Sequence, residues 1–138
     1  MSLVEIKQTA RQFFDDVYNQ ENLESIDTLV TPSFLYHARG EDVEGIEKFK
    51  KWISSDRAAF PDMRFAVVDS IAEGGKVATA FVVEGTHEKE FRGIPATRKK
   101  FETVGMTVFH FDGNKIKEAW VVVDGLSAAL QIGVVRRV

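Results

Sequence analysis

The sequence predicts an α+β fold in which N-terminal helices cover one face of a strongly curved antiparallel sheet. Residues before Pro61 place apolar side chains mainly at helical spacing, whereas those after it alternate at the period of strands. Two turn signals, Gly74-Gly75 and residues 112–114, divide the second part into hairpins. Helices followed by consecutive antiparallel strands are typical of this class. The 138 residues suit one domain over residues 1–138.

Three helices and a strand are expected before Pro61. Asn22 is a plausible N-cap for the second helix, and Pro32 terminates that helix. The third helix stops before Pro61, because proline disfavours helix at the residue that precedes it. In order, we expect a helix ending near Asn19, a helix from Asn22 to Pro32, a strand over 33–38, a loop over 39–45 and a helix ending at Phe60.

Four strands are expected after Pro61, in two hairpins. A basic connection over residues 89–100 joins the hairpins and is expected to form a ragged strand and loop, and residues 125–133 are expected to form a short helix or turn. A bent sheet closed by helices forms a cone, and the mouth of a cone is a natural pocket for a small ligand. The expected strands span residues 63–73, 76–88, 101–111 and 115–124.

Composition excludes several classes of function. A net charge of −3 and a pI near 5.6 do not favour nucleic acid or an anionic membrane as a partner. The chain has no cysteine, which excludes disulfides, thiolate chemistry and cysteine-ligated metals. No segment reads as a signal peptide or approaches the roughly 20 apolar residues that span a bilayer. We therefore expect a cytoplasmic protein with no nucleic-acid or membrane partner.

The last expected strand ends in Asp124, and two interpretations of this carboxylate are open. Trp120 and the run Val121–Val123 read as a buried strand, rich in aromatic and β-branched side chains. Asp124 with Gly125 is a frequent turn dipeptide. Alternatively, the carboxylate points into a cavity, where desolvation would raise its pKa and make it a better base near neutral pH.

Several motifs occur in a characteristic order: FPD at 60–62, EGTHEKEFRGIPAT at 84–97, FDGNKIKEAW at 111–120, Asp124, and LQIG at 130–133. In this order and spacing they resemble the SnoaL-like polyketide cyclases, a branch of the nuclear transport factor 2-like superfamily. The resemblance covers nearly the whole chain and implies a cone-shaped barrel. The chain departs from the family at PATR, residues 95–98, where PTG is usual. Arg98 thus replaces a glycine in a loop expected at the pocket mouth.

The resemblance implies an enzyme that uses neither a metal nor a cofactor. In the characterised cyclases an aspartate on the last long strand removes a proton next to a carbonyl group. The carbanion then closes a ring by an intramolecular aldol step, assisted by a histidine one strand away. Asp124 matches that aspartate and His110 matches that histidine. Relatives usually pair through the outer face of the sheet, so we expect a homodimer.

The turn at residues 112–114 decides whether His110 can assist Asp124. Trp120 and Asp124 share one face of their strand, because side chains alternate. A three-residue loop that pairs Phe111 with Lys115 would bring His110 to that face. A two-residue turn would leave it on the opposite face.

An apolar pocket with histidines at its rim is expected to bind a small carbonyl compound. Aromatic side chains at helical or strand spacing more often form core, and a single histidine more often has a structural role. No helical H-x-x-x-H or H-x-x-E-H spacing occurs, so no metal site is expected. The expected pocket residues are Phe14, Tyr18, His37, Phe60, His87 and Trp120.

Other functions of the superfamily are weighed against the same residues. Ketosteroid isomerases need a tyrosine and an aspartate at positions that hold Phe14 and about Ala38 here. Limonene-epoxide-hydrolase-like members need an Asp-Arg-Asp relay that we do not find. Two alternatives to a cyclase or isomerase remain: a non-catalytic module that binds a small apolar ligand, and a dehydratase or hydratase that uses Asp124 and His110.

Overall fold

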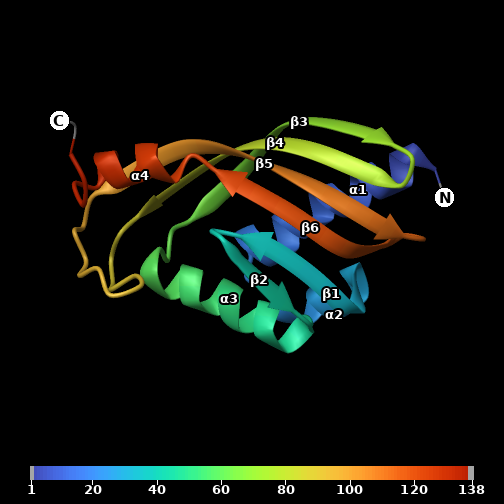
Figure 1. The fold of residues 1–138 in the computed structure, drawn as a ribbon, viewed down its shortest axis with the longest axis horizontal. Coiled ribbons are helices and arrows are strands. Elements are labelled where there is room, and N and C mark those ends of the chain that lie inside the picture. The colour runs from blue at the N-terminus through green and yellow to red at the C-terminus, as the bar shows by residue number, and fades with distance from the viewer. Residues whose placement is uncertain (1, 137–138) are drawn as a thin grey trace.

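The computed structural model describes residues 2–136, and the strands curve around the N-terminal helices (Figure 1). The predicted α+β class is confirmed. In chain order, the elements are α1 (Leu3–Gln12), the π-helix η1 (Phe13–Asn19), α2 (Leu23–Leu29), β1 (Val30–Ala38), β2 (Glu41–Glu44), α3 (Ile46–Ala59), β3 (Arg64–Glu73), β4 (Lys76–Thr86), β5 (Lys100–Asp112), β6 (Lys115–Val123) and α4 (Gly125–Gln131).

The sheet has the strand order β2-β1-β6-β5-β4-β3. Most neighbours run antiparallel as predicted, but β1 runs parallel to β6, so the sheet is mixed. The segment 39–45, predicted as a loop, contains the short edge strand β2, which pairs with the end of β1. The β1–β2 hairpin thus extends the long sheet on one side.

Pro32 has a different role from the predicted one. The second helix already ends at Leu29, and Pro32 lies inside β1. The pairing of β1 with β6 is interrupted here, because its register shifts between Val30 and Leu35. A proline has no backbone N–H to donate to a ladder, so an irregular stretch is where a strand tolerates it.

The first helix is tied to the sheet at its far end. Ser2 caps α1 by accepting a hydrogen bond from the Glu5 N–H at 3.0 Å. The helix continues through η1 to Asn19, as predicted. There the Asn19 amide donates to the Phe65 carbonyl at 2.9 Å and accepts from the Phe65 N–H at 2.7 Å. This pair of bonds fixes η1 against the start of β3.

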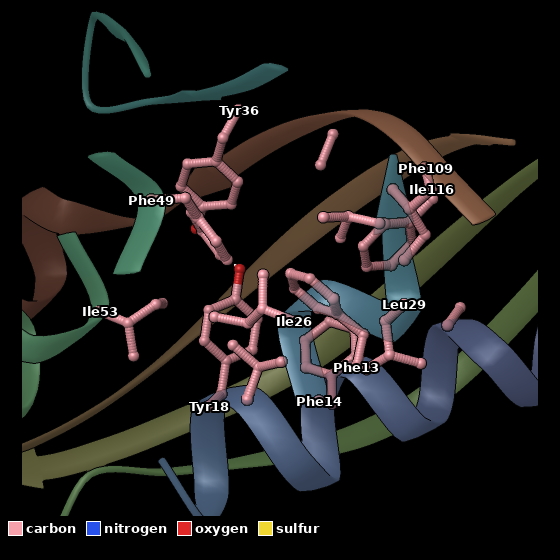
Figure 2. Packing of buried hydrophobic residues seen from close by; sticks show 14 of the residues in the cluster. Phe13, Phe14, Tyr18, Ile26, Leu29, Tyr36, Phe49, Ile53, Phe109 and Ile116 are labelled. Atoms are coloured by element: carbon pink, nitrogen blue, oxygen red, sulfur yellow. The ribbon is translucent and has the colours of Figure 1, made fainter. Parts of the chain in front are cut away.

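Aromatic rings from both layers fill the core between the helices and the sheet. Phe13 and Phe14 of η1 are fully buried, and Figure 2 shows them facing the interior beside Phe109 of β5. The Phe13 ring also stacks against Phe49 of α3, with centroids 5.8 Å apart. These contacts hold the helices to the concave face of the sheet.

Large apolar side chains are exposed on the opposite, outer face of the sheet, on β5 and β6. The predicted homodimer would cover this face. The homodimer stays a prediction. Among residues 2–136, the structure contains no helix with the length and hydropathy of a membrane-spanning segment. On the outer face of these two strands, the exposed apolar residues are Val104, Met106, Val108, Trp120 and Val122.

Gly105 leaves space in the sheet for the ring of Phe81. It lies in β5, opposite Phe81 of β4 and Val123 of β6. A Cβ atom at Gly105 would come within 2.5 Å of Phe81 Cζ and 2.7 Å of the Val122 carbonyl oxygen. Only glycine leaves room there for the Phe81 ring.

We predict that Gly105→Ala destabilises the protein by about 1–3 kcal/mol, the usual cost of forcing an extra carbon into a well-packed site. The measurement is the free energy of unfolding from urea titration. Gly125→Ala is the matched control, because a Cβ atom there meets nothing within 4 Å. Equal stability of the two variants would contradict the role given to Gly105.

Candidate active site

A cavity of about 490 Å³ lies between the concave face of the sheet, the end of α3, α4 and the connection from β4 to β5. Figure 1 shows α4 and this connection at the same end of the molecule. A volume of this size suits a small organic ligand. Most of the lining is apolar and consists of Ala38, Phe60, Met63, Phe65, Val83, Phe91, Ile94, Phe101, Val121, Val122, Val123, Ala128, Ala129, Ile132 and Val134.

Four polar side chains line the same cavity: Tyr18, Tyr36, Arg39 and Asp56, called here the polar cluster. The Tyr18 and Tyr36 hydroxyls form a hydrogen bond of 2.7 Å. Figure 2 shows Tyr18 reaching up from η1 toward Tyr36 of β1. Burial and the neighbouring tyrosine raise the pKa of Tyr18, and burial raises the pKa of Tyr36. Both hydroxyls are therefore neutral near pH 7 and can donate hydrogen bonds.

Asp56 and Arg39 form a bidentate ion pair. Arg39 Nη2 donates to Asp56 Oδ1 at 2.9 Å, and Nη1 donates to Oδ2 at 3.2 Å. The Asp56 side chain is 13% exposed, against 38% for Arg39. Burial raises the pKa of Asp56, and Arg39 with Arg92 offsets only part of that shift. The carboxylate is thus a stronger base than an exposed aspartate.

Residues 87–99, which connect β4 to β5, contribute Phe91 and Ile94 to the cavity wall. We predicted a ragged strand and loop over residues 89–100; the loop is present, and in place of the strand the structure has a local bridge between Phe91 and Ile94. Two backbone hydrogen bonds join the ends of the segment: His87 N–H to the Lys99 carbonyl and Arg98 N–H to the His87 carbonyl. Hydrogen bonds therefore hold the two ends of the segment together, and its tip forms part of the cavity wall.

Arginine side chains hold the tip of this segment against its neighbours. Arg92 forms an ion pair with Glu41 of β2. The Arg39 guanidinium lies 4.1 Å from the centroid of the Trp52 ring, and that of Arg92 lies 4.9 Å from it. Such cation–π contacts add to the ion pairs. Arg39 therefore contacts both Asp56 and the Trp52 ring on which Arg92 also lies.

Asp124 caps a helix in this structure. Its carboxylate accepts a hydrogen bond from the Ser127 N–H at 3.0 Å at the start of α4, and the residue is exposed. Its neighbours Val123 and Gly125 line the cavity, but Asp124 itself does not. The geometry matches the turn interpretation and places the carboxylate near the rim.

His110 lies on the outer face of the sheet. The hairpin turns through two residues, because Asp112 pairs with Lys115, and a bulge follows so that His110 pairs with Glu118. His110 therefore shares a face with Trp120, as a three-residue loop would have given. Phe109 and Phe111, its neighbours in β5, are the residues that face the buried side. The structure does not bring His110 and Asp124 together around the cavity.

Two of the six expected pocket residues, Tyr18 and Phe60, line the cavity. Phe14 is fully buried in the core instead, because its ring packs between Phe81 and Phe109. His87 is also fully buried and stacks on Phe60 with centroids 5.4 Å apart, outside the cavity lining.

His37 and Trp120 pair with each other on the outer face. Their rings stack with centroids 3.7 Å apart, and Trp120 is 50% exposed. His37 Nδ1 lies 2.6 Å from Asp42 and Nε2 lies 2.7 Å from Glu118. Strand alternation turns both residues away from the cavity, because Tyr36 and Val121 occupy the inward positions. Within residues 2–136, no group of three or more His, Asp or Glu could hold a metal ion.

Sequence reasoning missed Tyr36, Arg39 and Asp56. A signal for Asp56 was present, because Phe49, Ile53, Asp56 and Phe60 follow one another at helical spacing. An acidic residue on the apolar face of a helix is unusual and indicates a paired or functional charge. Nothing in the sequence placed Arg39 opposite it, since that contact depends on how β1 meets α3.

The fold and the cavity together define a cone-shaped α+β domain with a ligand-sized pocket. The sequence model of the SnoaL-like polyketide cyclase family matches residues 8–132, so the chain belongs to that family. No curated protein matches the sequence.

Solved structures agree with this assignment. A proposed polyketide cyclase from Acidithiobacillus ferrooxidans is 29% identical, with a TM-score of 0.82, 96% of this chain and 98% of that chain covered. IdmH, a proposed polyketide cyclase from Streptomyces antibioticus, is 27% identical, with a TM-score of 0.80 and coverages of 93% and 98%. A proposed SnoaL-like polyketide cyclase from Jannaschia sp. CCS1 shares the fold at 21% identity, with a TM-score of 0.85 and coverages of 94% and 92%.

We predict that Asp124→Ala lowers the free energy of unfolding by about 1 kcal/mol, because it removes the cap of α4. Asp124→Asn should be close to the wild type, since an asparagine side chain also caps helices. Chemical denaturation of the three proteins measures both effects. Equal losses in the two variants would show that the negative charge, rather than the cap, stabilises this end of the molecule.

The ion pairs of His37 predict a pH-dependent contribution to stability. Desolvation opposes the charged form, but Asp42 and Glu118 outweigh it and raise the pKa of His37 above its ordinary value of about 6.5. A raised pKa in the folded state means that the stabilisation is complete below the unfolded-state pKa. It is lost as the pH rises through the folded-state pKa.

We therefore expect the stability difference between the wild type and His37→Gln to be largest below pH 6 and to shrink above pH 7. Urea titrations from pH 5 to pH 9 measure this difference. A difference that stays constant over this range would rule out an ionic contribution from His37.

Proposed function

We propose that the protein catalyses cofactor-free acid–base chemistry on a small, polyketide-like carbonyl compound, by intramolecular aldol ring closure or isomerisation. The observation that carries the proposal is the cavity, whose apolar walls meet a single group of polar side chains, the polar cluster. Membership of the SnoaL-like polyketide cyclase family supports the same reaction class. The proposed cyclases at 27% and 29% identity support it further.

The chemistry of the lining suits proton abstraction next to a carbonyl group. Apolar walls exclude water, which strengthens hydrogen bonds to a developing enolate oxygen and raises the basicity of a carboxylate. Neutral tyrosine hydroxyls are donors for such an oxygen, and a buried carboxylate is an acceptor for the carbon-bound proton. The roles that the family resemblance implies for Asp124 and His110 remain predictions.

Proton exchange in D₂O tests the reaction class before any natural substrate is known. The wild type is incubated at pH 7 with β-keto esters and cyclic ketones, including 2-tetralone, and loss of the α-proton signal is followed by NMR. We expect the protein to accelerate exchange, by about 10²-fold or more when a positioned base acts. Binding of 2-naphthol, which has the shape of the enol of 2-tetralone, is followed by fluorescence.

A cavity-filling variant separates catalysis in the cavity from catalysis at the surface. Ala129→Phe places a ring in the lining of α4, and Leu126→Phe adds a similar ring to the same helix at an exposed position outside the lining. Exchange should fall in the first variant and persist in the second. A wild type that binds 2-naphthol without accelerating any exchange would favour the non-catalytic binding module.

A further inference from the structure

We propose that Asp56 is the general base of this cavity, that Arg39 is the residue that positions it, and that the Tyr18–Tyr36 hydroxyl pair donates to the enolate oxygen. The inference rests on the proposed function and goes beyond it by assigning the reacting groups. It gives the role of base to Asp56, which lines the cavity, in place of Asp124, which the family resemblance indicates and which does not line the cavity.

The place of Asp56 on α3 is the first argument. Phe49 and Ile53 precede it and Phe60 follows it at helical spacing, so a carboxylate occupies a position where an apolar residue would pack. A buried ion pair is weak evidence for stability, because apolar residues of similar volume often stabilise a protein as well or better. A role in chemistry accounts for a charge at this position.

The geometry of the ion pair leaves Asp56 free to act. Each carboxylate oxygen accepts one hydrogen bond from Arg39. An ionised carboxylate has about four acceptor sites, so two remain available. Because the Arg39 fork holds both oxygens, the carboxylate plane is fixed, and Asp56 lines the cavity in this orientation. The ion pair therefore orients the base without occupying all of its acceptor sites.

The tyrosine pair supplies the complementary donor. Two hydroxyls carry two hydrogens, and one hydrogen is used in the bond between them. Neither hydroxyl has a further hydrogen-bond partner among residues 2–136. One O–H is thus available to a ligand oxygen in the cavity. Donors fixed in advance where negative charge develops are the most effective electrostatic contribution to such a step.

The step balances within the cavity. An oxygen of Asp56 takes the proton from the carbon next to the carbonyl, and the electron pair of that C–H bond moves into the enolate, whose oxygen accepts the tyrosine hydrogen bond. The enolate carbon then attacks a second carbonyl carbon of the same molecule, and a C–C bond forms. Asp56 returns its proton to the new alkoxide. Substrate and product are isomers.

Asp56 and Asp124 lie in different surroundings, and the difference also favours Asp56 as the base. Asp56 faces Arg39 after β1, Arg92 of the connecting segment, Tyr18 of η1 and Tyr36 of β1. Burial still leaves its pKa raised. The Asp124 carboxylate is exposed and already accepts the hydrogen bond from Ser127.

The test compares Asp56→Asn with Asp124→Asn in the exchange of 2-tetralone protons in D₂O. Both changes remove one negative charge and keep the shape of the side chain, so each is the control for the other. We expect exchange to fall about 10²–10⁴-fold in Asp56→Asn, the usual contribution of a positioned base, and to stay within about threefold of the wild type in Asp124→Asn. Asp56→Asn should bind 2-naphthol at least as tightly as the wild type does, which shows that its cavity is intact.

Arg39→Lys tests the positioning role. It keeps a positive charge but loses the bidentate contact, so kcat for exchange should fall while KM for 2-tetralone changes less than about threefold. A change in KM alone would show that Arg39 binds the ligand and does not orient the base.

Each other outcome is informative. Fast exchange by Asp56→Asn would overturn the assignment of the base and leave the proposed function standing, and loss of exchange in Asp124→Asn alone would give the role to Asp124. An Asp56→Asn protein that no longer binds 2-naphthol would assign Asp56 to folding or binding and overturn its role as base. A wild type that binds 2-naphthol but does not accelerate proton exchange would overturn both proposals. A wild type that neither binds 2-naphthol nor accelerates exchange would also overturn both.

Discussion

The constraint on which the rest of the structure depends is the aromatic packing at one end of the cone. Phe13 and Phe14, on one turn of η1, are fully buried and contact rings from α3, β4 and β5. This packing fills the space beneath the sheet near α1 and α2. Toward α4, small and β-branched side chains such as Ala128, Ala129 and Val121 leave a cavity. Tyr18, one turn beyond Phe14, stands at the boundary between the two ends.

That boundary explains why polar groups gather there. A hydroxyl or carboxylate in a packed core must find a partner or destabilise the fold. Tyr18 finds Tyr36, and Asp56 finds Arg39, while all four still line the cavity. The polar cluster is therefore satisfied within the protein and remains open to a ligand. The same arrangement keeps the tyrosines neutral and makes Asp56 more basic than an exposed aspartate.

The position of Asp124 shows that family membership indicates the fold, whereas local geometry indicates what a particular carboxylate does. Membership follows from the match over residues 8–132 and the shared fold. It does not specify which carboxylate acts, because one fold can hold different sites. In this chain the Asp124 carboxylate caps α4, a helix whose next turns line the cavity. A residue at this position can therefore shape the pocket by holding its wall.

The sequence by itself determined the α+β class and the hairpin turns, because these depend on local periodicity and turn chemistry. It also contains a signal that the sequence reasoning missed, because Asp56 is an acid on an apolar helix face. Only the tertiary structure decided which strands pair and which side chains meet. The parallel pairing of β1 with β6 and the contact of Arg39 with Asp56 join different elements of the fold, and the bulge that puts His110 opposite Glu118 sets the register of a hairpin. Such contacts depend on strand register and on how helices cross the sheet, and neither is encoded in the spacing of a single segment.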